Sequence, residues 1–173
     1  GVMGKYFALA QGFEEDVANS ISDHYLPTGL TSVLPKKPFS YSISIVDKID
    51  TLVGFFVIDE KPTSSKDPFA LRRAAIGLLR IIIENKLSFK LRDLISYAIR
   101  LYQEQGVEIK NEKTEQEVLE FIKERMRNVL KLKNIKTDII EASISSHVGD
   151  NFSALYAKTI LMNKYKNKGI GLN

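Results

Sequence analysis

The sequence of 173 residues contains no cysteine. This absence excludes disulfide bonds, cysteine-ligated zinc, iron–sulfur clusters and thiol catalysis, and it is compatible with a reducing compartment. No apolar run approaches the roughly 20 residues that a membrane-spanning helix needs. The first residues, GVMGKYFALAQGF, lack the regions of a signal peptide and open within a helical pattern without an initiator methionine. We therefore expect a cytoplasmic piece of a longer protein, with no membrane partner.

Side chains that could perform catalysis are also few. Only two histidines are present, His24 and His147, and neither lies in a pattern typical of a nucleophile with its base. His24 follows a short helical pattern, where a histidine favours the helix C-terminus, and His147 lies in a short polar turn. No glycine-rich phosphate loop is present, since Gly54 and Gly77 stand alone in apolar segments. We expect no catalytic residue and no cofactor in this chain.

Apolar residues recur at helical spacing along nearly the whole chain, and strand signals are scarce. The segment 38–58, PFSYSISIVDKIDTLVGFFVI, is rich in β-branched residues and leaves room for a strand, but its length without a turn favours a buried helix. The sequence therefore predicts an all-α fold, a helical bundle. The helical segments are expected at 13–27, 38–58, 68–84, 89–106, 114–132, 137–146 and 151–169.

The stretch EKPTSSKDPFALRRAAIGLLRIII, residues 60–83, passes from a polar turn directly into an apolar helix. Asp67 is a suitable N-cap, and Pro68 fits the first helical position, where its missing N–H is harmless. The helix is expected to run to about Glu84 and to pack on several sides. The polar turn predicts a division into residues 1–60, a junction loop at 61–67, and a second helical region at 68–173.

Two carboxylates interrupt the apolar run in VDKIDT. Asp47 and Asp50 share one helical face, and a buried acid normally needs a partner or a metal. Catalysis is one interpretation. We favour the other, a structural role in which each acid either caps a neighbouring loop or forms an ion pair with an arginine such as Arg72 or Arg73.

Lysines and arginines gather around the loops that flank residues 38–58, and further lysines flank Tyr165. The net charge of +4 mildly favours an anionic partner. Such patches attract phosphate backbones, and Tyr165 could stack on an unpaired base, although charge runs are more often solvated faces. For a nucleic-acid partner, the expected contacts are Lys36, Lys37, Lys61, Lys66, Arg72, Arg73, Lys164 and Lys166.

Several of these stretches together resemble a known protein family. GVMGKYFALAQGF, HYLP and VDKIDTLVGFFVIDEKPTSSKDPFALRRAAIGLLRIIIE together resemble the beta subunit of the bacterial heterotetrameric glycyl-tRNA synthetase. Sequences of that family carry a similar Asp-Lys-x-Asp-Thr-x-x-Gly-Phe-Phe run that leads into Lys-Asp-Pro-Phe-Ala-Leu-Arg-Arg. The match covers most of residues 1–85. Beyond about residue 86 we recognise only a helical pattern, consistent with continuation toward the family's anticodon-binding region.

The resemblance implies a part of glycine–tRNA ligase, which uses ATP and Mg to activate glycine and then transfers it to its tRNA. In that family the alpha subunit carries the chemistry, and the beta subunit contributes tRNA recognition and assembly. The implied partners are glycine tRNA and the alpha subunit, with ATP and Mg bound outside this chain. Arg72 or Arg73 would then either bind phosphate or fix the junction through an ion pair.

The first part is also similar to the helical fold of HD-type metal phosphohydrolases, with Asp47 at the place of their last metal-ligand aspartate. The His-Asp pair that names that group should lie upstream of Gly1, so the HD-like part is expected to be incomplete and no metal ligand is assigned. A fragment of a metal-dependent phosphohydrolase and a helical scaffold that binds only other proteins remain the alternative functions.

Overall fold

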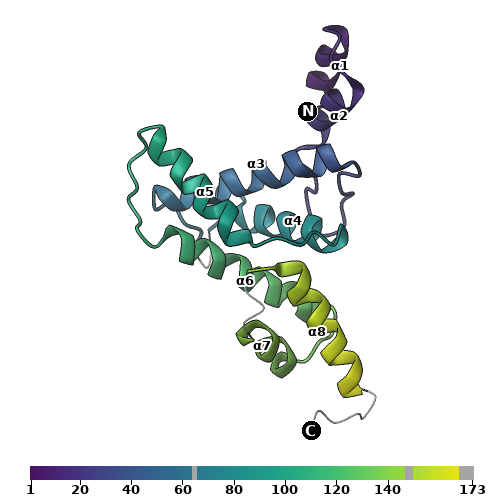
Figure 1. Ribbon diagram of the computed structural model, residues 1–173, viewed down its shortest axis with the longest axis vertical. Coiled ribbons are helices and arrows are strands. Elements are labelled where there is room, and N and C mark those ends of the chain that lie inside the picture. Colours follow the sequence, from purple (N-terminus) through teal and green to yellow (C-terminus); the bar gives the residue numbers. More distant parts are fainter. Residues whose placement is uncertain (64–65, 147–149, 168–173) are drawn as a thin grey trace.

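The computed structural model describes residues 1–63, 66–146 and 150–167, and these ranges contain α-helices and no strand (Figure 1). The predicted all-α fold class is therefore confirmed, and segment 38–58 is a helix. Helices and connections alternate along the chain, and the helices are α1 (Val2–Ala10), α2 (Glu15–Asp23), α3 (Pro38–Val57), α4 (Leu71–Glu84), α5 (Leu91–Glu104), α6 (Thr114–Leu132), α7 (Thr137–Ser145) and α8 (Phe152–Asn167).

The core forms where α3, α4, α5 and α6 pack together in the middle of the molecule (Figure 1). Helix α4 is central, because it packs against α3, α6 and α8 and most of its apolar side chains are fully buried. This arrangement confirms the prediction of an apolar helix covered on several sides. None of the described helices is both long and apolar enough to cross a membrane.

Helix α4 begins later than the sequence predicts. Pro68 and Phe69 form a turn, Ala70 adopts a left-handed conformation with φ of 55°, and the helix starts at Leu71. Stacking of the Phe69 ring on Phe55, with centroids 4.0 Å apart, holds this turn against α3. The placement of Pro68 at the first helical position is therefore wrong.

Asp67 lies outside α4, but its side chain still binds the N-terminus of this helix. Its carboxylate accepts hydrogen bonds from the backbone N–H groups of Leu71 at 2.8 Å and Arg72 at 3.0 Å. These N–H groups have no partner within the helix, so the carboxylate satisfies donors that would otherwise need water.

Two helix pairs extend from opposite sides of the central helices, one toward the top and one toward the bottom of the view (Figure 1). On one side α1 packs against α2, and α2 packs against α3. On the other side α7 and α8 pack together, with α7 against α6 and α8 against α4. The buried core takes residues from both sides of the connection between α3 and α4. The division into 1–60, 61–67 and 68–173 stays a prediction, as does the HD-like character of the first part.

Candidate nucleic-acid interface

The cations predicted to bind nucleic acid lie in four segments of the chain. Lys36 and Lys37 precede α3, and Lys61 and Lys66 lie between α3 and α4. Arg72 and Arg73 are in the first turn of α4. Lys164 and Lys166 lie near the end of α8, which points away from the rest of the molecule (Figure 1). The predicted cations therefore do not form one continuous patch.

Lys61 is committed to a structural network. Its Nζ atom lies 2.7 Å from Asp59 Oδ1 and 2.7 Å from Glu117 Oε2. Asn111 Nδ2 donates a further hydrogen bond to the same Glu117 oxygen at 2.9 Å. The hydrogen bonds that Lys61 donates to the two carboxylates raise the pKa of Lys61, and the one that it donates to Glu117 lowers the pKa of that carboxyl group. This ammonium group links the connection after α3 to the first turn of α6.

Other predicted cations also have acidic partners. Lys37 pairs with Asp16 of α2 at 2.5 Å, and this hydrogen bond raises the pKa of Lys37. Lys166 pairs with Asp138 at the start of α7, which lowers the pKa of that carboxyl group. These lysines tie neighbouring elements together, so their charges are partly neutralised within the protein.

The arginine pair divides into one structural and one exposed residue. Arg72 donates a hydrogen bond from Nη2 to the carbonyl of Thr63, and its Nη1 lies 3.9 Å from Asp67 Oδ2. Arg73 is exposed beside Arg72 at the rim of an open cavity of about 430 Å³ that is also lined by Gly29 and Ile76. Among the described residues, no ion pair engages Lys36, Lys66, Arg73 or Lys164.

The expected ion pair between α3 and α4 must be corrected. Within the described ranges, neither Asp47 nor Asp50 pairs with Arg72 or Arg73. Asp50 instead faces α5, where its Oδ1 accepts a hydrogen bond from the Tyr102 hydroxyl at 2.9 Å. Burial of Tyr102, together with this bond, raises its pKa to about 12.

The geometry of α3 and α4 explains why the pair does not form. Lys48 of α3 lies beside Gly77, in the middle of α4, whereas both arginines lie in the first turn of that helix. The connection before α4 supplies the nearer acceptors for Arg72, which are Asp67 and the carbonyl of Thr63.

Lys48 is an important residue that the sequence interpretation passed over. Its residue is only 4% exposed, and Nζ donates to Ser44 Oγ at 2.8 Å and to the His24 carbonyl at 3.2 Å. Burial lowers the pKa of Lys48 to about 8, against a small opposing effect of Asp47. The signal in the sequence was a lysine at a core position of an apolar helix.

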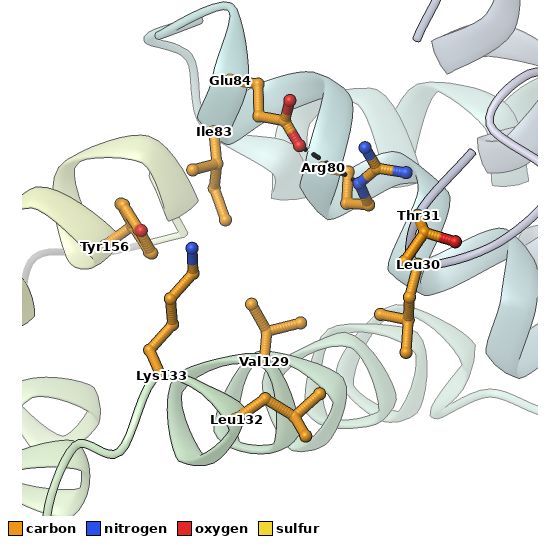
Figure 2. A pocket seen from close by; sticks show the side chains of 9 residues that line it. All are labelled: Leu30, Thr31, Arg80, Ile83, Glu84, Val129, Leu132, Lys133 and Tyr156. Atoms are coloured by element: carbon orange, nitrogen blue, oxygen red, sulfur yellow. Dashed lines mark hydrogen bonds and ion pairs between the residues drawn. The ribbon is translucent and has the colours of Figure 1, made fainter. Parts of the chain in front are cut away.

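A basic corner was also missed. Lys131, Lys133 and Lys136 are exposed around the turn from α6 to α7, and the ion pairs of the described residues include none of them. Beside them a cavity of about 530 Å³ opens between α4, α6, α8 and the loop before α3 (Figure 2). The local spacing of the sequence does not show that α8 packs on α4 and so places Tyr156 across this cavity from Val129 and Leu132 of α6.

In the part of the chain that the structure describes, no group of three or more histidine, aspartate or glutamate side chains is placed to hold a metal ion. Asp47, the residue compared with a metal ligand, has its backbone carbonyl bonded to Thr51 Oγ1 at 2.8 Å within α3. The features of the described residues that could bind a ligand are therefore the exposed cations and the open cavity.

Comparison with known proteins identifies the class. The sequence model described as "Glycyl-tRNA synthetase beta subunit" matches residues 1–145. The glycine–tRNA ligase beta subunit of Ruegeria sp. (strain TM1040) is 35% identical over 173 residues, 100% of this chain and 24% of the relative. That of Colwellia psychrerythraea is 44% identical over 145 residues, 84% of this chain and 21% of the relative. That of Rickettsia canadensis is 38% identical over 177 residues, 96% of this chain and 26% of the relative.

Each of these relatives is named as a subunit of a tRNA ligase. The chain belongs to the glycyl-tRNA synthetase beta subunit family. The match to residue 145 also carries the resemblance well beyond residue 86, after which the sequence alone shows only a helical pattern consistent with continuation of that subunit. The chain spans about a quarter of the length of these curated relatives.

Proposed function

We propose that this chain is part of the beta subunit of a glycine–tRNA ligase and contributes to the binding of glycine tRNA and to the architecture of the enzyme. Family membership supports the assignment to this subunit. The attachment of glycine, with the use of ATP and Mg, belongs in this proposal to the alpha subunit of a heterotetramer in the cytoplasm. The phosphohydrolase alternative is not favoured by these relatives.

The observation that carries the tRNA-binding role is the set of exposed cations without an acidic partner among the described residues, Lys36, Lys66, Arg73 and Lys164. A lysine held by a carboxylate must give up that partner before it can bind phosphate. An exposed cation binds phosphate without losing such a partner, and it displaces counterions condensed on the nucleic acid, whose release drives binding. In this proposal the helices hold a basic surface against tRNA by shape and charge.

A titration of the chain with glycine tRNA and with an unrelated tRNA over a series of salt concentrations tests this role. Phosphate contacts predict a steep decrease in affinity with salt, and specific recognition predicts tighter binding of glycine tRNA. Equal but salt-sensitive binding of both tRNAs would support a general electrostatic role. Absence of binding at low salt would overturn the tRNA-binding proposal.

The surface of α1 favours a second role, the binding of another protein segment. Val2, Met3, Tyr6 and Phe7 expose between 59% and 63% of their surface, and Ala8 is the buried residue of this helix. So many large apolar side chains on one short helix are typical of a surface that another protein covers. The alpha subunit is the partner that we propose for it.

Variants of α1 separate the two roles. Replacement of Met3 and Phe7 by glutamine is expected to abolish assembly with the alpha subunit in gel filtration while tRNA affinity is retained. Unchanged assembly would contradict the proposed role of α1.

A further inference from the structure

We propose that the cavity between α4, α6 and α8 binds one unstacked base of an RNA strand, with a neighbouring phosphate on Lys133. This inference rests on the proposed tRNA-binding function and names a site for it. The cavity volume of about 530 Å³ lies within the range of about 300–1,000 Å³ that ligand pockets occupy.

The walls of the cavity suit a flat aromatic group. Leu30, Val129 and Leu132 provide apolar sides, and Tyr156 of α8 supplies an aromatic ring (Figure 2). Every base has a flat face that can stack on such a ring, and stacking is a major part of single-strand RNA binding. Leu132 is 69% exposed, so this apolar wall is open to a ligand from solution.

The charges of the cavity favour a nucleotide over an apolar peptide. Arg80 is already engaged, because its Nη1 donates to the carbonyls of Gly29 at 2.7 Å and Ser32 at 2.8 Å, and its Nε donates to Glu84. Lys133 is therefore the cation left for a ligand, and its side chain extends from the end of α6 toward Ile83 beside Tyr156 (Figure 2).

Further cations lie around the cavity. Lys131 and Lys136 flank Lys133 on the same corner, and the ion pairs of the described residues include neither. A strand whose base enters the cavity would find further positive charge for its next phosphates. An apolar peptide would gain nothing from this charge.

Glu84 adds a preference among bases. Its Oε1 accepts from Arg80 Nε at 3.1 Å, and among the described residues no hydrogen bond engages Oε2. A carboxylate oxygen can accept from the exocyclic amino group of a base such as cytosine, whereas uracil presents an acceptor at the same position. The cavity should therefore prefer cytosine to uracil.

Binding of two RNA octamers, one of cytidines and one of uridines, to the full 173-residue chain tests the inference. The cytidine octamer should bind about tenfold tighter than the uridine octamer, since one good contact to a base edge is worth about that much. Glu84→Gln should remove most of this difference, because an amide can also donate to uracil. Tyr156→Leu should weaken the cytidine octamer by about tenfold through lost stacking.

Lys133→Gln should weaken both octamers and lower the salt slope by about one. The matched control is Lys123→Gln, the same change at a lysine within α6 that is paired with Glu120 at 2.8 Å, and it should alter binding little. Leu132→Glu, at an exposed position, should weaken both octamers without changing the melting temperature, which guards against effects through folding.

Equal effects of Lys133→Gln and Lys123→Gln, with no effect of Tyr156→Leu or Glu84→Gln, would overturn this inference. If glycine tRNA still bound with a steep salt slope in that case, the proposed function would stand without this site. If neither the octamers nor the tRNA bound at low salt, both proposals would fall.

Discussion

The Nζ atom of Lys48 donates hydrogen bonds to Ser44 Oγ at 2.8 Å and to the carbonyl of His24 at 3.2 Å, and no carboxylate of the described residues pairs with it. His24 directly follows α2, so one buried ammonium group joins the end of α2 to the middle of α3. Because a buried charge without a counter-charge is costly, this contact makes the stability of the fold depend on pH.

Lys48→Met should remove this dependence. Burial lowers the pKa of Lys48 to about 8 in the folded chain, against 10.5 without burial. Between these values the unfolded chain holds a proton that the folded chain has lost, so the free energy of unfolding rises with pH. From about pH 7.5 to about pH 9.5 the native chain should gain about 2 kcal/mol relative to the variant.

Urea unfolding of both proteins at the two pH values measures this gain. Lys110→Met, at an exposed lysine, is the matched control and should follow the native profile. Parallel profiles for the native protein and Lys48→Met would show that Lys48 is not the titrating group.

Gly77→Ala should destabilise the packing of α3 on α4. A Cβ atom at this position would lie 2.9 Å from Lys48 Cε and 3.3 Å from the carbonyl oxygen of Pro27. Crowding of this kind costs about 1–3 kcal/mol, which exceeds the roughly 0.5–1 kcal/mol that alanine gains over glycine in a helix. Thermal unfolding should show a lower melting temperature. Gly29→Ala is the control, since no atom lies within 4 Å of a Cβ there.

The clash can be assigned to its partner by a double-mutant cycle. Gly77→Ala should cost less in a Lys48→Ala background, because the side chain that it meets is shorter. An equal cost in both backgrounds would place the strain at Pro27 instead.

Glu117→Gln should weaken the link between α6 and the connection after α3. The Lys61 ammonium group would lose one of its carboxylates, which is worth about 0.5–1 kcal/mol for a partly exposed pair. The pKa of Glu117 is lowered in the folded protein, so this stabilisation is present above the ordinary value of 4.5 and is lost as the pH falls through the folded pKa.

Native protein and Glu117→Gln should therefore differ in denaturant unfolding at neutral pH and converge in acid. Glu112→Gln, an exposed acid in the connection between α5 and α6, is the control and should match the native protein at both pH values. A constant difference between native protein and Glu117→Gln from neutral to acid pH would argue against the ion pair.

Arg73→Gln should weaken tRNA binding more than Lys61→Gln. Arg73 is exposed and outside the ion pairs of the described residues, whereas Lys61 is held by Asp59 and Glu117. Loss of one phosphate contact should lower the salt slope by about one. The melting temperature of Arg73→Gln should stay close to that of the native protein, since a surface change away from structural contacts alters stability by about 0.5 kcal/mol or less.

Fluorescence titration of labelled tRNA at several salt concentrations measures these slopes. Equal slopes for the two variants would mean that pairing within the protein does not decide which cations meet phosphate. A large loss of stability in Arg73→Gln would indicate that Arg73 has a structural role at the junction between α3 and α4.

The helices could be predicted from the sequence because their apolar spacing is local information. The start of α4 could not, since the Phe69 ring stacks on Phe55 of another helix and so draws Pro68 out of the helical turn. Long-range packing of this kind overrides the N-terminal propensity of proline. Local spacing therefore identified the helix but placed its first residue too early.

The partners of the charged residues also depend on long-range packing that the local sequence does not reveal. The sequence predicts an ion pair between Arg72 or Arg73 and an acid of α3, but Arg72 lies near Asp67 instead. Which residues of α3 face the first turn of α4 depends on how far the two helices are displaced along their axes. Likewise, the cavity beside Lys133 exists only because α8 returns to α4.

The packing of α1 against α2 affects where the chain unfolds locally. Ala8 is the buried residue of α1, whereas α4 buries most of its length in the common core. Separation of α1 from α2 therefore exposes little apolar surface, and its amide hydrogens should exchange with deuterium far sooner than those of α4. A protein that covers α1 would slow this exchange, so the labelling pattern of the first ten residues reports directly on whether that surface is occupied.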